Sequence, residues 1–198
     1  MKTVHFFMAV LVTVIIAAAC NNPRTADDSV DQAQDVNDST AMTNEDDADF
    51  AVKAADAGLA EVELGKLALE KATDQRIKDF AKKMVDDHQR ANDELMTIAT
   101  RHNITLPPVI SEEHADKQRK LMEKSGEEFD REYIDAMVKD HNKVVSLFED
   151  ASSDARNADL QAFAAKILPT LKKHHEEAKA LQDSINPMDT TTVQRIIP

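Results

Sequence analysis

The sequence predicts an all-α protein, on three observations. From Asp49 onward Ala, Leu, Lys, Glu and Asp dominate, and the whole chain holds 3 glycines. No segment of useful length alternates polar and apolar residues with the period of two that a half-buried strand requires. Apolar residues instead recur at alternating spacings of three and four, which places them on one face of a helix.

Four long helices and one short helix are expected from these spacings and from residues that cap or break helices. Thr73 and Asp74 are cap-forming residues that separate the first two long helices. Paired prolines in the segment 103–108 cannot continue a helix. Ser111 then opens a short helix, which ends at Gly126. The expected helices cover residues 47–72, 74–102, 111–124, 127–153 and 157–184.

The lengths of the connections predict the topology. The first and the last connection span only a few residues, so each joins two antiparallel helices in a hairpin. The connection between the second and third long helices exceeds about twenty residues, which is enough to cross the length of a bundle. Two antiparallel hairpins joined by a long crossover that carries a short helix form a ferritin-like four-helix bundle, which we expect for residues 48–184.

The first twenty residues resemble the signal peptide of a bacterial lipoprotein. Lys2 gives a positive start, residues 6–16 form an apolar run, and three alanines precede Cys20. The run is too short for a comfortable membrane span. The resemblance implies that Cys20 becomes the lipidated N-terminus after cleavage; the alternative is an ordinary signal peptide with Cys20 as a spare thiol. Because Asn21 is not the aspartate that often retains lipoproteins at the inner membrane, we expect a lipid-anchored envelope protein on the outer membrane, facing the periplasm.

The segments that flank the bundle are expected to be unstructured. Residues 21–47 hold many acidic and small polar residues and few large apolar ones, which predicts a disordered acidic tether. Residues 185–198 are expected to form a frayed tail. The formal charge of −13 argues against nucleic acid as a partner and against electrostatic docking on anionic lipid. Membrane contact is therefore expected through the N-terminal lipid only, while a homo-oligomer or an envelope protein partner stays open.

One polar residue that can bind a metal interrupts the apolar face of each long helix. In chain order these residues are Glu61, His88, His141 and His174. Because each face points into the bundle, the four side chains should meet there. Counted in residues from the hairpin turns, three of these side chains lie at the same height along the bundle. His174 lies about one helical turn farther from its hairpin turn, unless Pro169 bends its helix. Histidine is a common metal ligand, so these residues form a candidate site for a transition metal, namely Fe, Zn, Mn or Cu.

Two acidic residues complete the candidate metal site. Asp87 and Asp140 directly precede two of the histidines, and we place them behind the four candidate ligands. A di-iron carboxylate enzyme needs two Glu-x-x-His pairs. The residues three positions before the histidines are Val85, Val138 and Leu171. A di-iron enzyme is therefore not expected, and no catalytic residue is assigned.

Three functions fit this pattern. The leading one is a non-catalytic metal-binding or stress-related bundle. The second is an interaction module whose polar seam only fixes helix register, with Glu61 satisfying an imidazole without metal. The third is an oxidoreductase with a mononuclear iron, manganese or copper centre. The methionines Met84, Met96, Met122 and Met137 are interpreted as core or crossover residues rather than copper ligands.

Several short motifs are shared with one bacterial family. They are Asp49-Phe50, the run GLAEVELGKLA at 58–68, Phe80-Ala81, Met84-Val85, Asp87-His88, Phe129-Asp130, Tyr133, His141, and Leu168-Pro169 followed by His174. Over residues 49–183 the chain thereby resembles exported ferritin-like proteins of unknown function, often labelled predicted outer-membrane proteins. The resemblance implies a ferritin-like four-helix bundle in the periplasm or on the outer membrane, and it implies no established activity.

Overall fold

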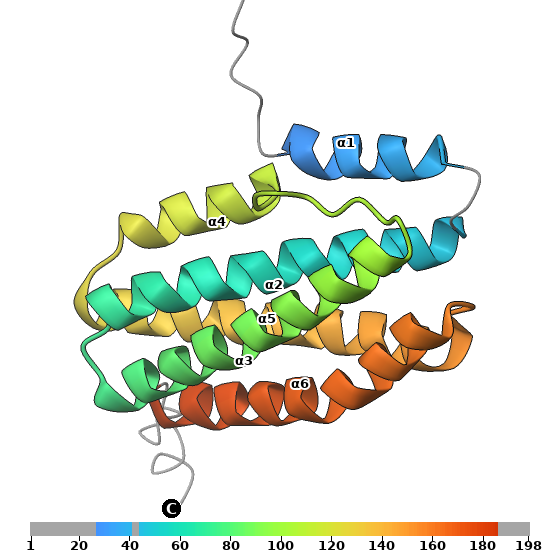
Figure 1. Cartoon of the computed structure of the whole chain (residues 1–198). Helices are drawn as coiled ribbons and strands as arrows, with labels where there is room; N and C mark the ends of the chain where they lie inside the picture. Colours follow the sequence, from blue (N-terminus) through green and yellow to red (C-terminus); the bar gives the residue numbers. More distant parts are fainter. Residues whose placement is uncertain (1–26, 41–43, 186–198) are drawn as a thin grey trace, which may run out of the picture.

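The computed structural model describes residues 27–40 and 44–185, and these residues form six α-helices and no strand. The helices are α1 (Asp27–Asp38), α2 (Glu45–Lys71), α3 (Gln75–Arg101), α4 (Glu112–Met122), α5 (Gly126–Asp154) and α6 (Ala158–Ile185) (Figure 1). The all-α prediction is confirmed, and each end of the five expected helices lies within two residues of its predicted position. The predicted signal peptide with Cys20, and the predicted tail beyond Ile185, lie outside the described residues.

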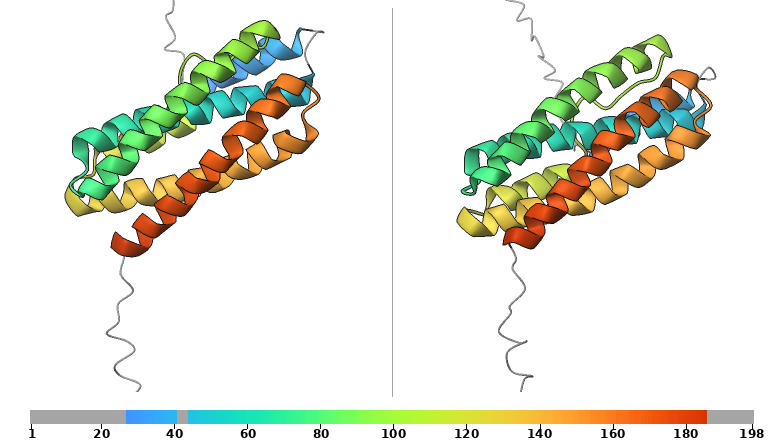
Figure 2. Two further views of the ribbon diagram at one scale, coloured as in Figure 1. Left: turned by 60° about the horizontal axis from the view of Figure 1, so that its bottom comes forward. Right: turned by 90° about the horizontal axis from the view of Figure 1, so that it is seen from below.

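The four long helices pack as two hairpins. Helix α2 packs against α3, and α5 packs against α6. The hairpins then meet through α2 against α5 and α3 against α6, as the views in Figure 2 show. Helix α3 ends at the opposite end of the bundle from the start of α5, so the connection that carries α4 runs back along α2 and α5.

The predicted apolar faces form a core that a polar layer divides into two clusters. One cluster, around Phe50, Leu95 and Phe148, lies toward the α5–α6 turn. The other, around Met84 and Tyr133, lies toward the α2–α3 turn. Between the two clusters, every long helix contributes one polar side chain that is at most 7% exposed. These side chains are Glu61, His88, His141 and His174.

Each hairpin turn is held by a buried aspartate from the other hairpin. Asp47, in the first turn of α2, accepts hydrogen bonds from the backbone N–H groups of Arg156 and Asn157, both at 2.9 Å. Asp130, near the start of α5, accepts bonds from the backbone of Thr73 at 3.0 Å and of Asp74 at 2.9 Å. The Thr73 hydroxyl also donates to Asp130, at 2.6 Å. These bonds fix the longitudinal register of the two hairpins, and therefore the level at which the polar side chains meet.

Replacing Asp130 with alanine is expected to lower the free energy of unfolding by about 2–4 kcal/mol, because several buried donors lose a charged acceptor. Urea denaturation measures this loss. Glu127→Ala is the matched control in the first turn of the same helix, since the Glu127 side chain is 89% exposed. Equal midpoints for the two variants would contradict the role assigned to Asp130.

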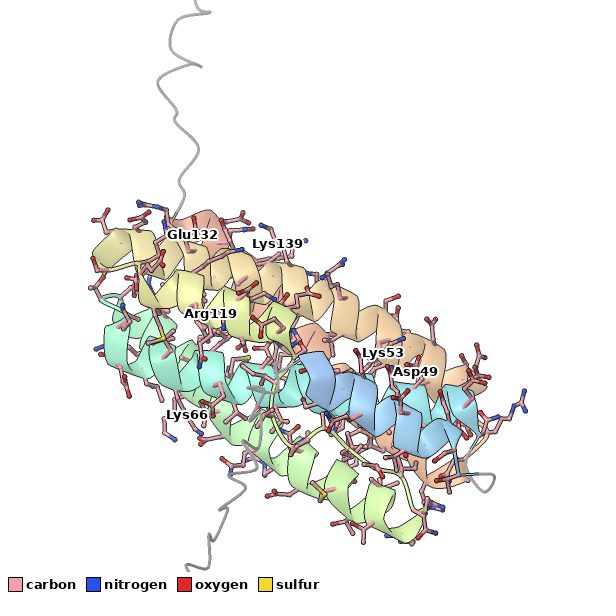
Figure 3. The ribbon with its side chains drawn as sticks, turned by 90° about the horizontal axis from the view of Figure 1, so that it is seen from above. Asp49, Lys53, Lys66, Arg119, Glu132 and Lys139 are labelled. Carbon is pink, nitrogen blue, oxygen red and sulfur yellow. The ribbon has the colours of Figure 1, made fainter. Side chains whose placement is uncertain are left out.

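Helix α1 differs from the disordered tether expected for residues 21–47. Its Ala33 and Asn37 are only 2% and 3% exposed. The Asn37 side chain donates to the carbonyl of Thr105 at 2.9 Å and accepts from its N–H at 2.8 Å. Gln34 donates to Asp49, which lies beside α1 in Figure 3. Side-chain amides rather than an apolar stripe hold this helix, so the expectation of disorder, which rested on low hydrophobicity, does not apply to residues 27–38.

Candidate metal centre

Three imidazoles from three helices form a nearly equilateral triangle inside the bundle. The ring centroids of His88, His141 and His174 are 5.6, 5.5 and 5.5 Å apart. Each ring offers one nitrogen, and these nitrogens all lie within 4.8 Å of one another. Nitrogens that share one tetrahedral ion at about 2.1 Å would lie about 3.4 Å apart. Small rotations of the rings would therefore bring the nitrogens to ligand distance.

Hydrogen bonds orient two of the three rings. His141 donates from Nδ1 to the backbone carbonyl of Met137 at 3.0 Å, one turn earlier in α5. His174 donates from Nε2 to the carboxylate of Asp87 at 2.9 Å, across the α3–α6 interface. Such bonds fix the tautomer and leave the opposite nitrogen with a free lone pair, as in most metal-ligating histidines.

The nitrogens opposite these bonds are buried and find no hydrogen-bond partner among the described residues. They are Nε2 of His141 and Nδ1 of His174, and Nε2 of His88 joins them in the same state. Leaving a buried polar atom unpaired costs about 1–3 kcal/mol, so such atoms are rare in folded proteins. Three of them gathered in one layer are the strongest sign of a missing partner.

Burial keeps all three imidazoles neutral. It lowers the pKa of His88 well below its ordinary value, and the neighbouring rings of His141 and His174 lower it further. Burial lowers the pKa of His141 to about 3, with a smaller contribution from His174. The pKa of His174 is also lowered by burial, although its bond to Asp87 opposes the change. Neutral imidazole is the form that binds metals.

Glu61 lies beside His141, outside the group of three histidine nitrogens that lie within 4.8 Å of one another. Its Oε1 is 3.6 Å from Nδ1 of His141, and its buried Oε2 has no hydrogen-bond partner among the described residues. Burial raises the pKa of Glu61 to about 8, the Asp140 carboxylate adds to the rise, and Lys117 opposes it. In the metal-free state the carboxyl is therefore mostly protonated at neutral pH, and a cation in the layer would favour the carboxylate.

The two predicted acidic residues have different partners. Asp87 does lie behind a site histidine, but that histidine is His174 on the neighbouring helix rather than the adjacent His88. Asp87 also pairs with Arg90 on its outer side. Asp140 instead accepts two bonds of 2.6 Å from Lys117 of α4. Its position about 100° round the helix turns it toward the crossover, so Asp140 acts on the site through the charge it places near Glu61.

Sequence reasoning missed two contributors to this region. Lys117 reaches the site from the short crossover helix, whose own apolar pattern is weak. Tyr133 is fully buried, its hydroxyl lacks a partner among the described residues, and burial followed by the nearby Glu61 raises its pKa well above the ordinary value. Tyr133 is the single tyrosine of the chain and lies two turns before His141, which is the one signal the sequence offers.

A surface hollow between α3 and α6 reaches the histidine layer. It measures about 200 Å³ and is lined by His88 and His174 at its base, with Arg90 and Lys166 among its other residues. Figure 2 shows these two helices side by side. Helix α6 stays helical through Pro169 and bends along its length in Figure 1, and His174 lies level with the other rings. The hollow therefore connects the histidine layer with the surface.

Comparison with known proteins identifies the family of this chain. A family model described as a domain of unknown function, DUF4142, matches residues 32–181. The chain belongs to the DUF4142 family. No curated protein matched this DUF4142 chain, and no solved structure matched it. Within residues 27–40 and 44–185, no helix of the DUF4142 protein is both long and apolar enough to cross a membrane.

Proposed function

We propose that this DUF4142 protein binds one transition-metal ion through His88, His141 and His174. Two observations on the same three histidines carry the proposal. Each ring has one buried nitrogen without a hydrogen-bond partner among the described residues, and each offers a nitrogen within 4.8 Å of one on both other rings. Two of the rings already carry the outer hydrogen bond that orients a ligand. A layer that served packing alone would satisfy its polar atoms internally or replace them with apolar groups.

The donor set favours particular metals. Three imidazoles suit zinc, copper and iron, whereas manganese prefers carboxylate and carbonyl oxygens. Glu61 lies 3.6 Å from His141 but outside the group of three histidines, so it becomes a fourth ligand only if its side chain moves and otherwise supplies a carboxyl beside the ion. The site has one carboxylate and no second metal position among the described residues, which favours a single ion. We therefore propose zinc, copper or iron.

We place this centre in a lipid-anchored envelope protein. The signal-like first twenty residues and Cys20 support an anchor, and the acidic chain supports a domain that is held near a membrane by its acyl groups alone. Two hairpins with a long crossover support a ferritin-like bundle. Since the paired Glu-x-x-His pattern is absent, we propose a non-catalytic role in metal binding or envelope stress rather than di-iron oxidation.

Metal titration of the purified protein tests the proposal. We expect one equivalent of Co²⁺ to bind and to give the visible absorption of a tetrahedral or five-coordinate nitrogen-bound ion. Zn²⁺ should displace it with the same stoichiometry. Elemental analysis of protein from its native envelope then identifies the physiological metal. Absence of saturable binding at one equivalent would contradict the proposal.

A further inference from the structure

The core is incompletely filled on one side of the histidine layer. A cavity of about 20 Å³ lies there, bordered by Glu61, His88 and His141. Its other walls come from residues one to three helical turns away from the site, toward the α5–α6 turn. Among them are Gly58 on α2, Ala91 on α3, Val144 on α5 and Leu171 on α6. Neighbouring helices around the bundle run antiparallel, so positions before the site residue on α2 and α6 lie level with positions after it on α3 and α5. These residues therefore form one layer next to the rings.

The opposite side of the histidine layer is tightly packed. One turn away in that direction stand Leu64, Met84, Met137 and Ala178, and each is at most 1% exposed. An ion held by the three rings would therefore have protein atoms pressed against one side and free space on the other. Three protein ligands with one open position are the arrangement of metal sites that accept an external ligand.

The size and the walls of the cavity restrict what it can hold. A cavity needs roughly 10–15 Å³ to hold one water, so about 20 Å³ admits a molecule of one or two non-hydrogen atoms. Side chains such as Phe148, Phe163 and Leu171 make most of its wall apolar. The apolar part of the wall disfavours ions, because an ion loses its hydration there, while Glu61, Asn92 and two of the rings give the cavity a polar end. A neutral diatomic molecule fits both restrictions.

We propose that this cavity binds a neutral diatomic molecule, of the class of nitric oxide, carbon monoxide and dioxygen, at the open position of a ferrous or cuprous ion held by the three histidines. The inference rests on the proposed function. Glu61 borders both the rings and the cavity, and its Oε2 is buried without a partner among the described residues. In its protonated form that carboxyl would donate a hydrogen bond to the outer atom of the bound molecule, which makes Glu61 a positioning residue. Binding is reversible: one metal–ligand bond forms, the same bond breaks on release, and no electron leaves the complex.

Nitric oxide binding to the Fe²⁺-loaded protein is the test. The full chain carries Cys20→Ser, so that its one thiol cannot bind iron or nitric oxide. Iron is added without oxygen, and elemental analysis counts it. Nitric oxide is then titrated, with the electron paramagnetic resonance signal of the ferrous nitrosyl complex as the readout. We expect one saturable nitrosyl signal per iron.

Variants at Val144 assign that signal to the cavity. Val144→Ile fills the space and should weaken nitric oxide binding at least about tenfold, with iron affinity changed less than about threefold. Met84→Leu, a volume-conserving change on the packed side, is the matched control and should leave both affinities unchanged. Ala91→Val fills the cavity from another helix and repeats the test if Val144→Ile fails to fold. Circular dichroism checks the fold of each variant.

The outcomes separate the two proposals. If iron does not bind, the proposed metal site is wrong and the cavity proposal falls with it. If iron binds but no nitrosyl signal forms, or if both cavity-filling variants bind nitric oxide as tightly as the parent, the metal site stands and the cavity proposal is overturned.

Discussion

Replacing His141 with alanine is expected to weaken Zn²⁺ binding by at least about a hundredfold. The substitution removes one of three nitrogen donors, and loss of an outer-shell partner alone costs about ten- to a hundredfold. Competition with a chromophoric chelator measures the affinity. His141 is fully buried between the two core clusters, so unfolding curves must accompany the measurement and show that the variant remains folded in the titration buffer.

The matched control is His175→Ala. His175 follows His174 directly on α6, but it is partly exposed and is not among the three histidines whose ligand nitrogens lie within 4.8 Å of one another. Its removal is expected to change Zn²⁺ affinity less than about twofold. A general effect of losing a histidine would weaken both variants, whereas a specific site weakens only His141→Ala. Equal affinity in the parent and in His141→Ala would leave the polar layer with a structural role in helix register.

Asp87 should give an intermediate result in the same assay. Asp87→Ala removes the acceptor that orients His174 but leaves all three nitrogens in place. We therefore expect a loss of about ten- to a hundredfold. Asp86→Ala is the control, since exposed Asp86 pairs with Lys82 at the surface. A larger loss of Zn²⁺ affinity in His141→Ala than in Asp87→Ala would distinguish a metal ligand from a residue that only orients a ligand.

The main architecture followed from sequence because helical spacing is a strong geometric constraint. A residue on a seam faces the same neighbour as those three and four positions away, so four interrupted seams predicted four converging side chains. Connection lengths then predicted the two hairpins. Even the level of the site could be counted, because Glu61, His88 and His141 lie at similar distances from their hairpin turns.

The features that were not predicted depend on contacts between helices, which the spacing of apolar residues along one helix does not describe. The bond from His174 to Asp87 depends on the rotation of α3 about its axis, and the bond from Asp140 to Lys117 on where the crossover lies. Helix α1 is held by the Asn37 amide, which composition counts toward disorder. Polar bonds of this kind carry little hydrophobic signal, although they position the site and the helix beside it.

The metal-free protein is expected to lose stability in mild acid. The pKa values of His88, His141 and His174 are lowered by burial, so between their folded values and about 6.5 the unfolded chain binds more protons. Stability from these groups is therefore present above about pH 6.5 and is lost as pH falls. For His141 alone, with a folded pKa of about 3, the full loss is on the order of 5 kcal/mol.

Glu61 changes the stability with pH in the direction opposite to the histidines. Its folded pKa of about 8 lies above its ordinary value of 4.5, so the folded state holds the extra proton between these limits. Its contribution is fully present below about pH 4.5 and is lost as pH rises toward 8. Charged groups on the packed helices also act on the site. Asp140 raises the pKa of Glu61 and Lys117 lowers it, while Asp87 and Glu177 raise the pKa of His174 and Lys83 lowers it. Stability should therefore be highest near pH 6.5.

Urea denaturation in the presence of a chelator, between pH 5 and pH 8, measures both the loss of stability in acid and the loss of stability above about pH 6.5. We expect the unfolding free energy to be lower at pH 5 than at pH 6.5 by about 2–3 kcal/mol, because three imidazoles outweigh one carboxyl. Replacing all three histidines with leucine should remove the loss of stability in acid. Glu61 alone then sets the slope, so the stability of this variant should fall steadily from about pH 5 to pH 8. A triple variant with the same acid slope as the parent would mean that the rings are hydrated, and a dry metal site of this geometry would then be ruled out.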